Sequence, residues 1–251
     1  MACGPGVTYV SAKFSKFNCA FPYKGAHHSM LMYFVTSGLI DTNQDFFYGL
    51  TAEELEYFIS VANKFDRAAA NASLCELHAY ATGILTPEEY ASWQRVCSTH
   101  PNLETLTTAY PDLNVDNKTF VMAVRHPVDR MMSTYFFVTD GWGANLRGFI
   151  GNNPEEQAAK TLAAIGTRLY NTDQAAYLPT SGTKQLFRLG SDFHTNVAAC
   201  IENLGGTVSG EWHLNNNATR ERDYTTLLTA TTIQDLETAL AGDVAVWNAA
   251  V

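Results

Sequence analysis

A loop rich in anion-binding groups follows the first short run of β-forming residues, 17–21. Lys24 and Gly25 lie in this loop, and Ser29 stands directly before an apolar helical segment, 30–34. A strand, a turn and a helix N-terminus in succession offer backbone N–H groups, the positive end of a helix dipole and, here, one ammonium group. This combination indicates a phosphate-type cradle, although the spacing is not that of a Walker A loop. The structural alternative is an ordinary tight turn, because lysine and glycine are common in loops.

A second set of residues suited to the same chemistry follows the β-forming run 119–124. Arg125 comes directly after this run, Pro127 is typical of the first turn of a helix, and Ser133 lies about two turns further on. A guanidinium at a strand exit and a hydroxyl on the next helix can converge on one anion. The structural alternative is an arginine that caps the sheet edge and a serine on a helix flank.

Helices and strands that alternate along the chain must position these two junctions. Thr51 with Glu54 forms a capping box, and Pro87 and Pro154 each follow a capping residue and precede acidic residues. Helices are predicted over 51–67, 87–96, 154–170, 191–204 and 232–249, and strands over 17–21, 119–124, 185–189 and 207–212. Such alternation is typical of an α/β protein with a parallel sheet, in which ligands bind at the carboxyl ends of the strands.

Composition and charge restrict the class of protein further. The 251 residues are 46% hydrophobic and 16% charged, without a linker-like stretch or an internal repeat, and we therefore expect one domain over residues 1–251. Sixteen Lys and Arg against 25 Asp and Glu give a formal charge of -9, which argues against nonspecific binding to nucleic acid or an anionic membrane. The sequence contains no signal-peptide or membrane-spanning run, and its five cysteines are scattered, so we expect a soluble, cytoplasmic protein with reduced thiols.

The two junctions together resemble the signature of a known family. The downstream junction reads Arg125-x-Pro127-x-x-Arg130-x-x-Ser133. With the Pro-x-Lys-Gly-x-x-x-Ser loop upstream, this pattern resembles sulfotransferases that use 3′-phosphoadenylyl sulfate (PAPS), in particular carbohydrate sulfotransferases of the heparan/dermatan 2-O type. The segments 173–178, 185–189 and 212–215 resemble later parts of the family, the first of them its glutamine-containing segment. The resemblance implies a three-layer, P-loop-like α/β fold with a central parallel sheet flanked by helices.

The resemblance also implies a role for each group of residues. The upstream loop would hold the 5′-phosphosulfate of PAPS with Lys24, Gly25, Ala26, His27, His28 and Ser29. Arg125 and Ser133 would hold its 3′-phosphate, and Arg220 or Arg222, in the family's cofactor-covering loop, would make a further contact. Two departures from the family's pattern stand out. His126 replaces an acid, and the two histidines of the upstream loop replace small residues, where they either crowd the cofactor or add donors to it.

Sulfuryl transfer needs charge stabilisation on the leaving group and usually a general base. Lys24 fits the first role, because its ammonium can follow negative charge as it builds on the leaving oxygen. The family places a histidine between the two motifs, and His100 is the matching residue, with His78 and Glu104 as alternatives. His78 also reads as a core histidine. Cys97-x-x-His100 is a single pair of metal-type ligands, so no metal site is predicted.

The negative net charge also bears on the acceptor. Heparan enzymes act on polyanions, but a charge of -9 with few basic clusters favours a neutral or weakly charged acceptor, such as a small molecule, a saccharide or a lipid headgroup. Two other functions stay open: a P-loop small-molecule kinase, and a non-catalytic relative that binds PAPS or adenosine 3′,5′-bisphosphate. The sequence leaves the oligomeric state open as well.

Overall fold

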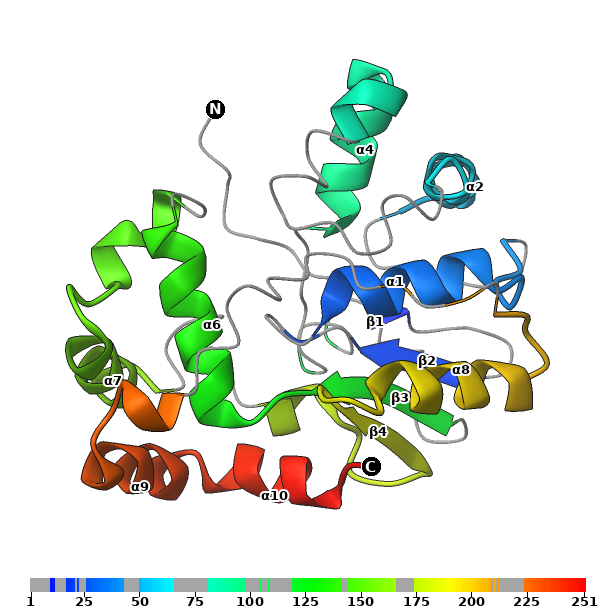
Figure 1. Ribbon diagram of the computed structural model, residues 1–251. Coiled ribbons are helices and arrows are strands. Elements are labelled where there is room, and N and C mark those ends of the chain that lie inside the picture. Colours follow the sequence, from blue (N-terminus) through cyan, green and yellow to red (C-terminus); the bar gives the residue numbers. More distant parts are fainter. Residues whose placement is uncertain are drawn as a thin grey trace.

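The computed structural model of the chain describes residues 10–11, 17–20, 22, 26–42, 50–65, 81–97, 104, 108, 119–140, 144–165, 174–208, 210, 212 and 224–251 (Figure 1). The strands are β1 (Val10–Ser11), β2 (Phe17–Ala20), β3 (Thr119–Val124) and β4 (Lys184–Arg188). The α-helices are α1 (His27–Thr36), α2 (Ala52–Ala62), α4 (Pro87–Cys97), α6 (Pro127–Thr139), α7 (Pro154–Ala163), α8 (Phe193–Asn203), α9 (Ala230–Ala239) and α10 (Ala241–Ala249). Short 3-10 helices are η2 (Ala144–Phe149), η4 (Gln174–Tyr177) and η6 (Tyr224–Thr226).

The strands form one sheet in the order β1-β2-β3-β4. β1 runs antiparallel to β2, whereas β2, β3 and β4 run parallel, with Ala20 opposite Met122 and Val124 opposite Arg188. The predicted α/β class with a parallel sheet is thus confirmed, and the three parallel strands lie within one residue of their predicted bounds. Because parallel strands end at the same edge, the connections after β2, β3 and β4 all leave the sheet on one side.

Side chains of the strands alternate between two buried faces of the sheet. The face covered by α1 and α8 carries Cys19, Val121, Ala123 and Phe187. The opposite face, which packs on η4 and α10, carries Ala20, Phe120, Met122, Val124 and Leu186. Helices therefore flank the sheet on both sides (Figure 1). Burial on both faces explains why β3 is a continuous apolar run in the sequence rather than an alternating one.

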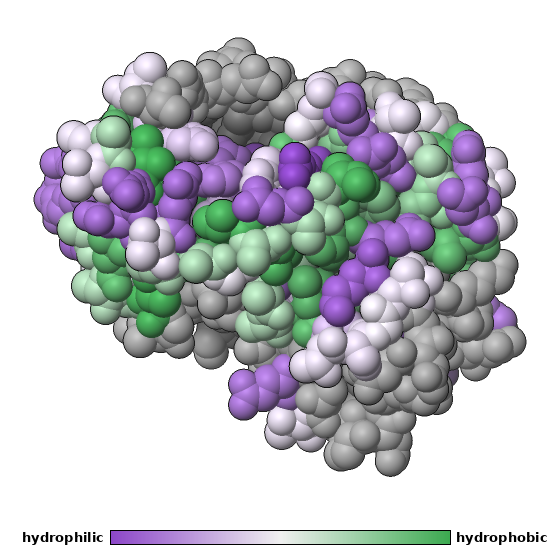
Figure 2. All heavy atoms as spheres, turned by 90° about the horizontal axis from the view of Figure 1, so that it is seen from below, coloured by the Kyte–Doolittle hydropathy of each residue, from purple (hydrophilic) through white to green (hydrophobic). Residues whose placement is uncertain are grey.

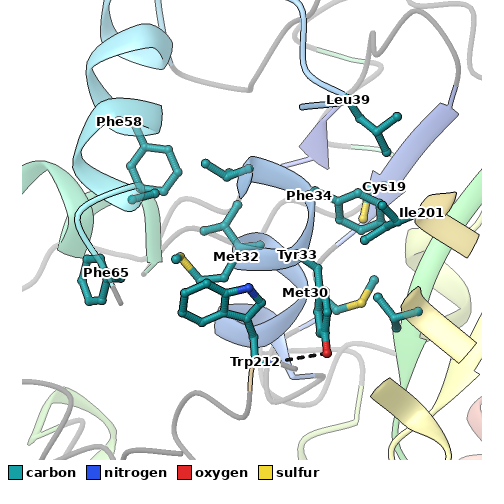
Figure 3. Packing of buried hydrophobic residues seen from close by; sticks show 14 of the residues in the cluster. Cys19, Met30, Met32, Tyr33, Phe34, Leu39, Phe58, Phe65, Ile201 and Trp212 are labelled. Atoms are coloured by element: carbon teal, nitrogen blue, oxygen red, sulfur yellow. Dashed lines mark hydrogen bonds between the residues drawn. The ribbon is translucent and has the colours of Figure 1, made fainter. Parts of the chain in front are cut away.

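α1 is buried on nearly every side. Each of its residues from Met30 to Val35 is at most 4% exposed, because the helix packs between the sheet, α2 and α8. In Figure 3, the Tyr33 ring points toward Trp212, whose backbone N–H donates to the Tyr33 hydroxyl at 3.1 Å. A helix that is apolar all round has to be an inner element of this kind or a membrane span. Neither α1 nor any other described helix is long and apolar enough to cross a membrane.

Two cysteines lie in the same hydrophobic cluster as α1. Cys19 on β2 and Cys200 on α8 are buried free thiols. Burial raises the pKa of Cys19, and it raises the pKa of Cys200 to about 11. Because the thiolate is the reactive form, we expect both side chains to be inert in the folded protein.

A second group of helices lies beyond the carboxyl ends of the strands (Figure 1). α6 packs on α7 and α9 through a separate cluster that includes Val128, Met132 and Leu236. α9 continues into α10, which returns to the sheet and contacts η4 and β4. Figure 2, which views the molecule from below α9 and α10, shows apolar and polar residues interspersed over this side. The helices beyond the strand ends are therefore tied to the sheet through the last helix of the chain.

The segment 232–249, predicted as one helix, forms two. α9 ends at Ala239 and α10 begins at Ala241, with Leu240 between them at φ -108° and ψ 33°. Gly242 weakens the helix propensity here, and Asp243 is fully buried in an ion pair with Arg130. The break allows α9 to follow α6 and α10 to follow the sheet.

Other predicted bounds also differ from the observed ones. The helix predicted over 51–67 ends at Ala62, and the one predicted over 154–170 ends at Ala163. No strand forms at the described residues of 207–212. There, the Thr207 N–H donates to the Ser37 carbonyl at 2.9 Å, and the Trp212 N–H donates to Tyr33. Packing against α1 has thus taken backbone donors that a sheet would need, and it overrides a weak β propensity.

Candidate functional site

The two junctions predicted from the sequence leave neighbouring strands at one edge of the sheet. α1 follows β2 and α6 follows β3, and these strands pair in parallel (Figure 1). α8, which follows β4, starts at the same edge, where the Leu189 N–H extends the ladder by donating to the Val124 carbonyl at 2.9 Å. Helix N-termini carry partial positive charge, so this edge favours an anion.

The start of α1 contains one residue in an unusual conformation. Ala26 caps the helix at φ 57°, in the left-handed region that non-glycine residues seldom adopt. Its carbonyl accepts from the Met30 N–H at 3.0 Å, so α1 begins at His27. Ser29 therefore lies inside the first turn, where it is 4% exposed, rather than ahead of the helix as the sequence suggested. Of the predicted phosphosulfate loop, this places the backbone of Ala26, His27, His28 and Ser29 at the strand edge.

Arg125 stands at the exit of β3, as predicted. Its Nε atom lies 2.7 Å from Oδ2 of Asp129, one turn further along, and its side chain is 22% exposed. α6 begins at Pro127, and Ser133 is partly buried within it. A half-exposed carboxylate of the next helix thus lies against the Arg125 guanidinium.

The second arginine of the pattern, Arg130, points into the protein instead. It is 3% exposed, and its Nη2 atom donates to Oδ2 of Asp243 at 2.8 Å. Asp243 is completely buried and comes from α10, 113 residues away. Arg130 therefore ties α6 to the last helix and does not face the strand edge.

His126, the departure from the family's acid, lies in an aromatic enclosure. Its ring stacks on Tyr224 with the planes 6° apart and meets the edge of Trp247, with centroids 5.8 Å and 5.9 Å away. Nε2 lies 3.3 Å from Oε1 of Glu237, which also lines an open hollow of about 500 Å³ along α9. Burial lowers the pKa of His126, and Glu237 only partly opposes this. We therefore expect a neutral imidazole at neutral pH.

A second histidine environment lies at the start of α8. His194 Nδ1 is 2.9 Å from the hydroxyl of Tyr33, which in turn accepts from the backbone N–H of Trp212. Side chains on a helix point toward its N-terminus, and the Tyr33 hydroxyl therefore reaches back toward the first turn of α1 (Figure 3). This pair could not be predicted from the sequence, because its members are 161 residues apart.

Several predicted site residues lie outside the described part of the chain. These are Lys24, Gly25, His78, His100, Arg220 and Arg222. Glu104, an alternative base, is described and exposed. The roles assigned to all of these residues stay predictions.

The residues that sequence reasoning missed are buried polar groups. Asp243 and Gln174 are both completely buried, and they connect α10 and η4 to the exit of β3. The available signal for Asp243 was a single acid within the apolar segment 241–249, and Gln174 belongs to the segment that resembled the family's glutamine-containing one. Comparisons of the chain with family models, curated proteins and solved structures gave no significant match.

Proposed function

We propose that the protein is a PAPS-dependent sulfotransferase, which moves a sulfuryl group from PAPS to a hydroxyl or amine of a neutral or weakly charged acceptor. The observation that carries this proposal is the parallel pairing of β2 with β3. This pairing brings the start of α1 and the residue Arg125 to the same edge of the sheet. The three-layer arrangement is in keeping with a P-loop-like fold, which is part of the same proposal.

The described groups at this edge suit a ligand with two separated anionic ends. The first turn of α1 would hold the 5′-phosphosulfate, because its backbone N–H groups and dipole favour negative charge. Arg125, with Ser133 on the following helix, would hold the 3′-phosphate. A charge-assisted contact to a guanidinium is worth about 1.5–3 kcal/mol, so Arg125 would be a major contributor to affinity.

The chemical step needs a proton acceptor and a charge partner for the leaving group. His100 would remove the proton from the acceptor as its oxygen or nitrogen bonds to sulfur and the bond from sulfur to the bridging phosphate oxygen breaks. Lys24 would stabilise the negative charge on that oxygen, and adenosine 3′,5′-bisphosphate would leave with the electron pair. Both assignments rest on the resemblance of the sequence motifs.

A panel of thermal melts tests the cofactor class. We expect adenosine 3′,5′-bisphosphate to raise the melting temperature of the full chain, because a ligand that binds only the folded state stabilises it. ATP with Mg²⁺ and NAD serve as comparisons. A rise with ATP and Mg²⁺ alone would favour a small-molecule kinase, and no rise with the bisphosphate would contradict the proposal.

Transfer of labelled sulfate from PAPS then tests the reaction. We expect label on neutral saccharides, lipid headgroups or small hydroxyl and amine compounds, and little on heparan-like chains, given the formal charge of -9. His100→Ala should abolish transfer and retain binding of the bisphosphate. If the wild-type chain binds the bisphosphate but transfers sulfate to no acceptor, it would instead be a non-catalytic relative of the sulfotransferases.

A further inference from the structure

The backbone of Arg125 is held by one buried side chain. The Arg125 N–H donates to Oε1 of Gln174 at 2.9 Å, and Nε2 of Gln174 donates back to the Arg125 carbonyl at 2.8 Å. Gln174 is fully buried, and the Arg125 backbone with which it bonds is partly buried. Both backbone groups of one residue are thus fixed by a single amide.

The position of this contact explains why it exists. Leu189 pairs with Val124 at the end of the ladder between β3 and β4, and the strands separate beyond it. Buried backbone groups need partners, and Arg125 has left the sheet that would have provided them. The primary amide of Gln174 supplies one acceptor and one donor, as a neighbouring strand would.

Gln174 is itself held by the buried ion pair. Its backbone N–H donates to Oδ1 of Asp243, while the other oxygen of Asp243 accepts from Arg130 at 2.8 Å. A buried ion pair adds little net stability, because both charges lose their hydration. Its geometry, however, fixes η4, α6 and α10 relative to one another at the point where Gln174 meets Arg125.

We propose that Gln174 is a positioning residue for Arg125, oriented by the Arg130–Asp243 pair, and that it determines the preference of the site for nucleotides with a 3′-phosphate. This inference rests on the proposed function. With φ and ψ of Arg125 fixed by the Gln174 amide, the guanidinium is presented to ligand from one backbone geometry. A preorganised cation binds more tightly, because less conformational freedom is lost on binding.

The test compares two ligands and two buried glutamines. Gln174→Met keeps the side-chain volume and removes both hydrogen bonds. Gln157→Met is the matched control, because Gln157 is also buried, accepts from the Gly151 N–H at 2.9 Å and lies on α7. Adenosine 3′,5′-bisphosphate and adenosine 5′-phosphate are titrated against each folded variant by calorimetry.

We expect Gln174→Met to weaken binding of the bisphosphate by up to about tenfold, the cost of ordering one long side chain on binding, and to leave binding of adenosine 5′-phosphate unchanged. Gln157→Met should preserve the ratio of the two affinities, even if it lowers the melting temperature as much as Gln174→Met does. In an Arg125→Ala background, Gln174→Met should cause no further loss, because it acts through Arg125. Gln174→Asn, whose amide is one methylene shorter and loses at least one bond to the Arg125 backbone, should also lower the ratio and serves if Gln174→Met does not fold.

Two results would overturn the inference while leaving the proposed function intact. One is a wild-type ratio of affinities in folded Gln174→Met, or in Gln174→Asn where that variant is the one tested. The other is equal weakening of both ligands, which indicates a general structural role. A wild-type chain that fails to bind the bisphosphate would refute the proposed function first, and the inference with it.

Discussion

In the proposed site, Asp129 and the 3′-phosphate of a ligand would compete for the guanidinium of Arg125. Asp129 holds it from the following turn of helix, with a side chain that is 42% exposed, and a bound phosphate would take the same donors. Ion pairs this exposed contribute little to stability, typically up to about 1 kcal/mol. Asp129 therefore orients the Arg125 side chain with little effect on the stability of the fold. Its carboxylate also adds negative charge next to an incoming anion.

Neutralising Asp129 should strengthen ligand binding. We expect Asp129→Asn to bind adenosine 3′,5′-bisphosphate up to about fivefold more tightly, because repulsion worth about 1 kcal/mol or less is removed. Calorimetric titration at low and high salt measures this, and the gain should shrink as salt screens the charge. Glu237→Gln, a charge change on α9, is the control. Weaker binding by Asp129→Asn would show that its carboxylate matters more for orienting Arg125 than for repelling ligand.

His126 should make stability depend on pH below neutrality. Burial lowers its pKa in the folded state, so the unfolded chain takes up the proton first as the pH falls through about 6.5. The contribution of His126 to stability is then complete above that pH and declines below it. Urea unfolding of the wild type and of His126→Gln measures the difference in free energy, which should be larger at pH 7.5 than at pH 5.5. An equal difference at both values would contradict a lowered pKa.

At the scale of elements, the start of α1 combines strain with a location at the carboxyl ends of the parallel strands. Ala26 adopts φ 57° without the glycine that would make this conformation inexpensive. A left-handed alanine costs about 1–2 kcal/mol relative to the right-handed region. The surrounding structure, in which α1 is buried between the sheet and two helices, imposes this conformation.

Two substitutions of Ala26, by glycine and by valine, should change the stability of the fold in opposite directions. Ala26→Gly is expected to stabilise the fold by about 0.5–1 kcal/mol, because relief of strain exceeds the added entropy of the unfolded chain. Ala26→Val should destabilise it, since a β-branched side chain is still less compatible with positive φ. Chemical denaturation compares the two variants with wild type. A destabilising glycine would mean that the conformation is not strained.

Elements with local start signals were predictable from the sequence. The capping box at Thr51 and the proline after Asn153 define the starts of α2 and α7 because those bonds join residues only three apart. The break at Leu240 was not predictable, since it depends on what Asp243 meets elsewhere in the fold. For the same reason the outcome of the β propensity in 207–212 was not predictable, since the backbone N–H groups of Thr207 and Trp212 donate to Ser37 and Tyr33.

At the scale of the whole molecule, the last helix is coupled to the candidate site. The Arg130–Asp243 pair joins α10 to α6, and Arg188 on β4 donates to the carbonyls of Trp247 and Asn248. The backbone of Val251 also pairs with β4, through Leu186 and Arg188. The edge strand of the sheet is thereby covered by the end of the chain.

Removing one member of the buried ion pair should destabilise the fold far more than removing both members. Asp243→Ala leaves the Arg130 guanidinium buried without its counter-charge and should cost about 3–5 kcal/mol. The double variant Arg130→Met with Asp243→Asn should recover most of this loss, because no buried charge remains and the buried Gln174 N–H keeps an acceptor. Urea unfolding measures both. If the double variant were no more stable than Asp243→Ala, the ion pair would contribute more to the free energy of unfolding than the lost hydration of its two charges predicts.

The candidate site was predictable where its residues follow strands directly. Arg125 and Pro127 could be placed because a strand, a turn and a helix are consecutive in the sequence. The contact of Arg125 with Gln174, 49 residues away, and that of Gln174 with Asp243, 69 residues away, could not be predicted. No local spacing in the sequence encodes contacts between such distant segments. The buried direction of Arg130 depended on the same long-range contacts.

Binding of adenosine 3′,5′-bisphosphate to the wild-type chain and to Arg125→Ala, measured by calorimetry, tests the central claim most directly. The account predicts saturable binding to the wild type and a loss of about tenfold or more in the variant, the value of one charge-assisted contact. Equal affinities of the two proteins, or no binding to the wild type, would contradict it.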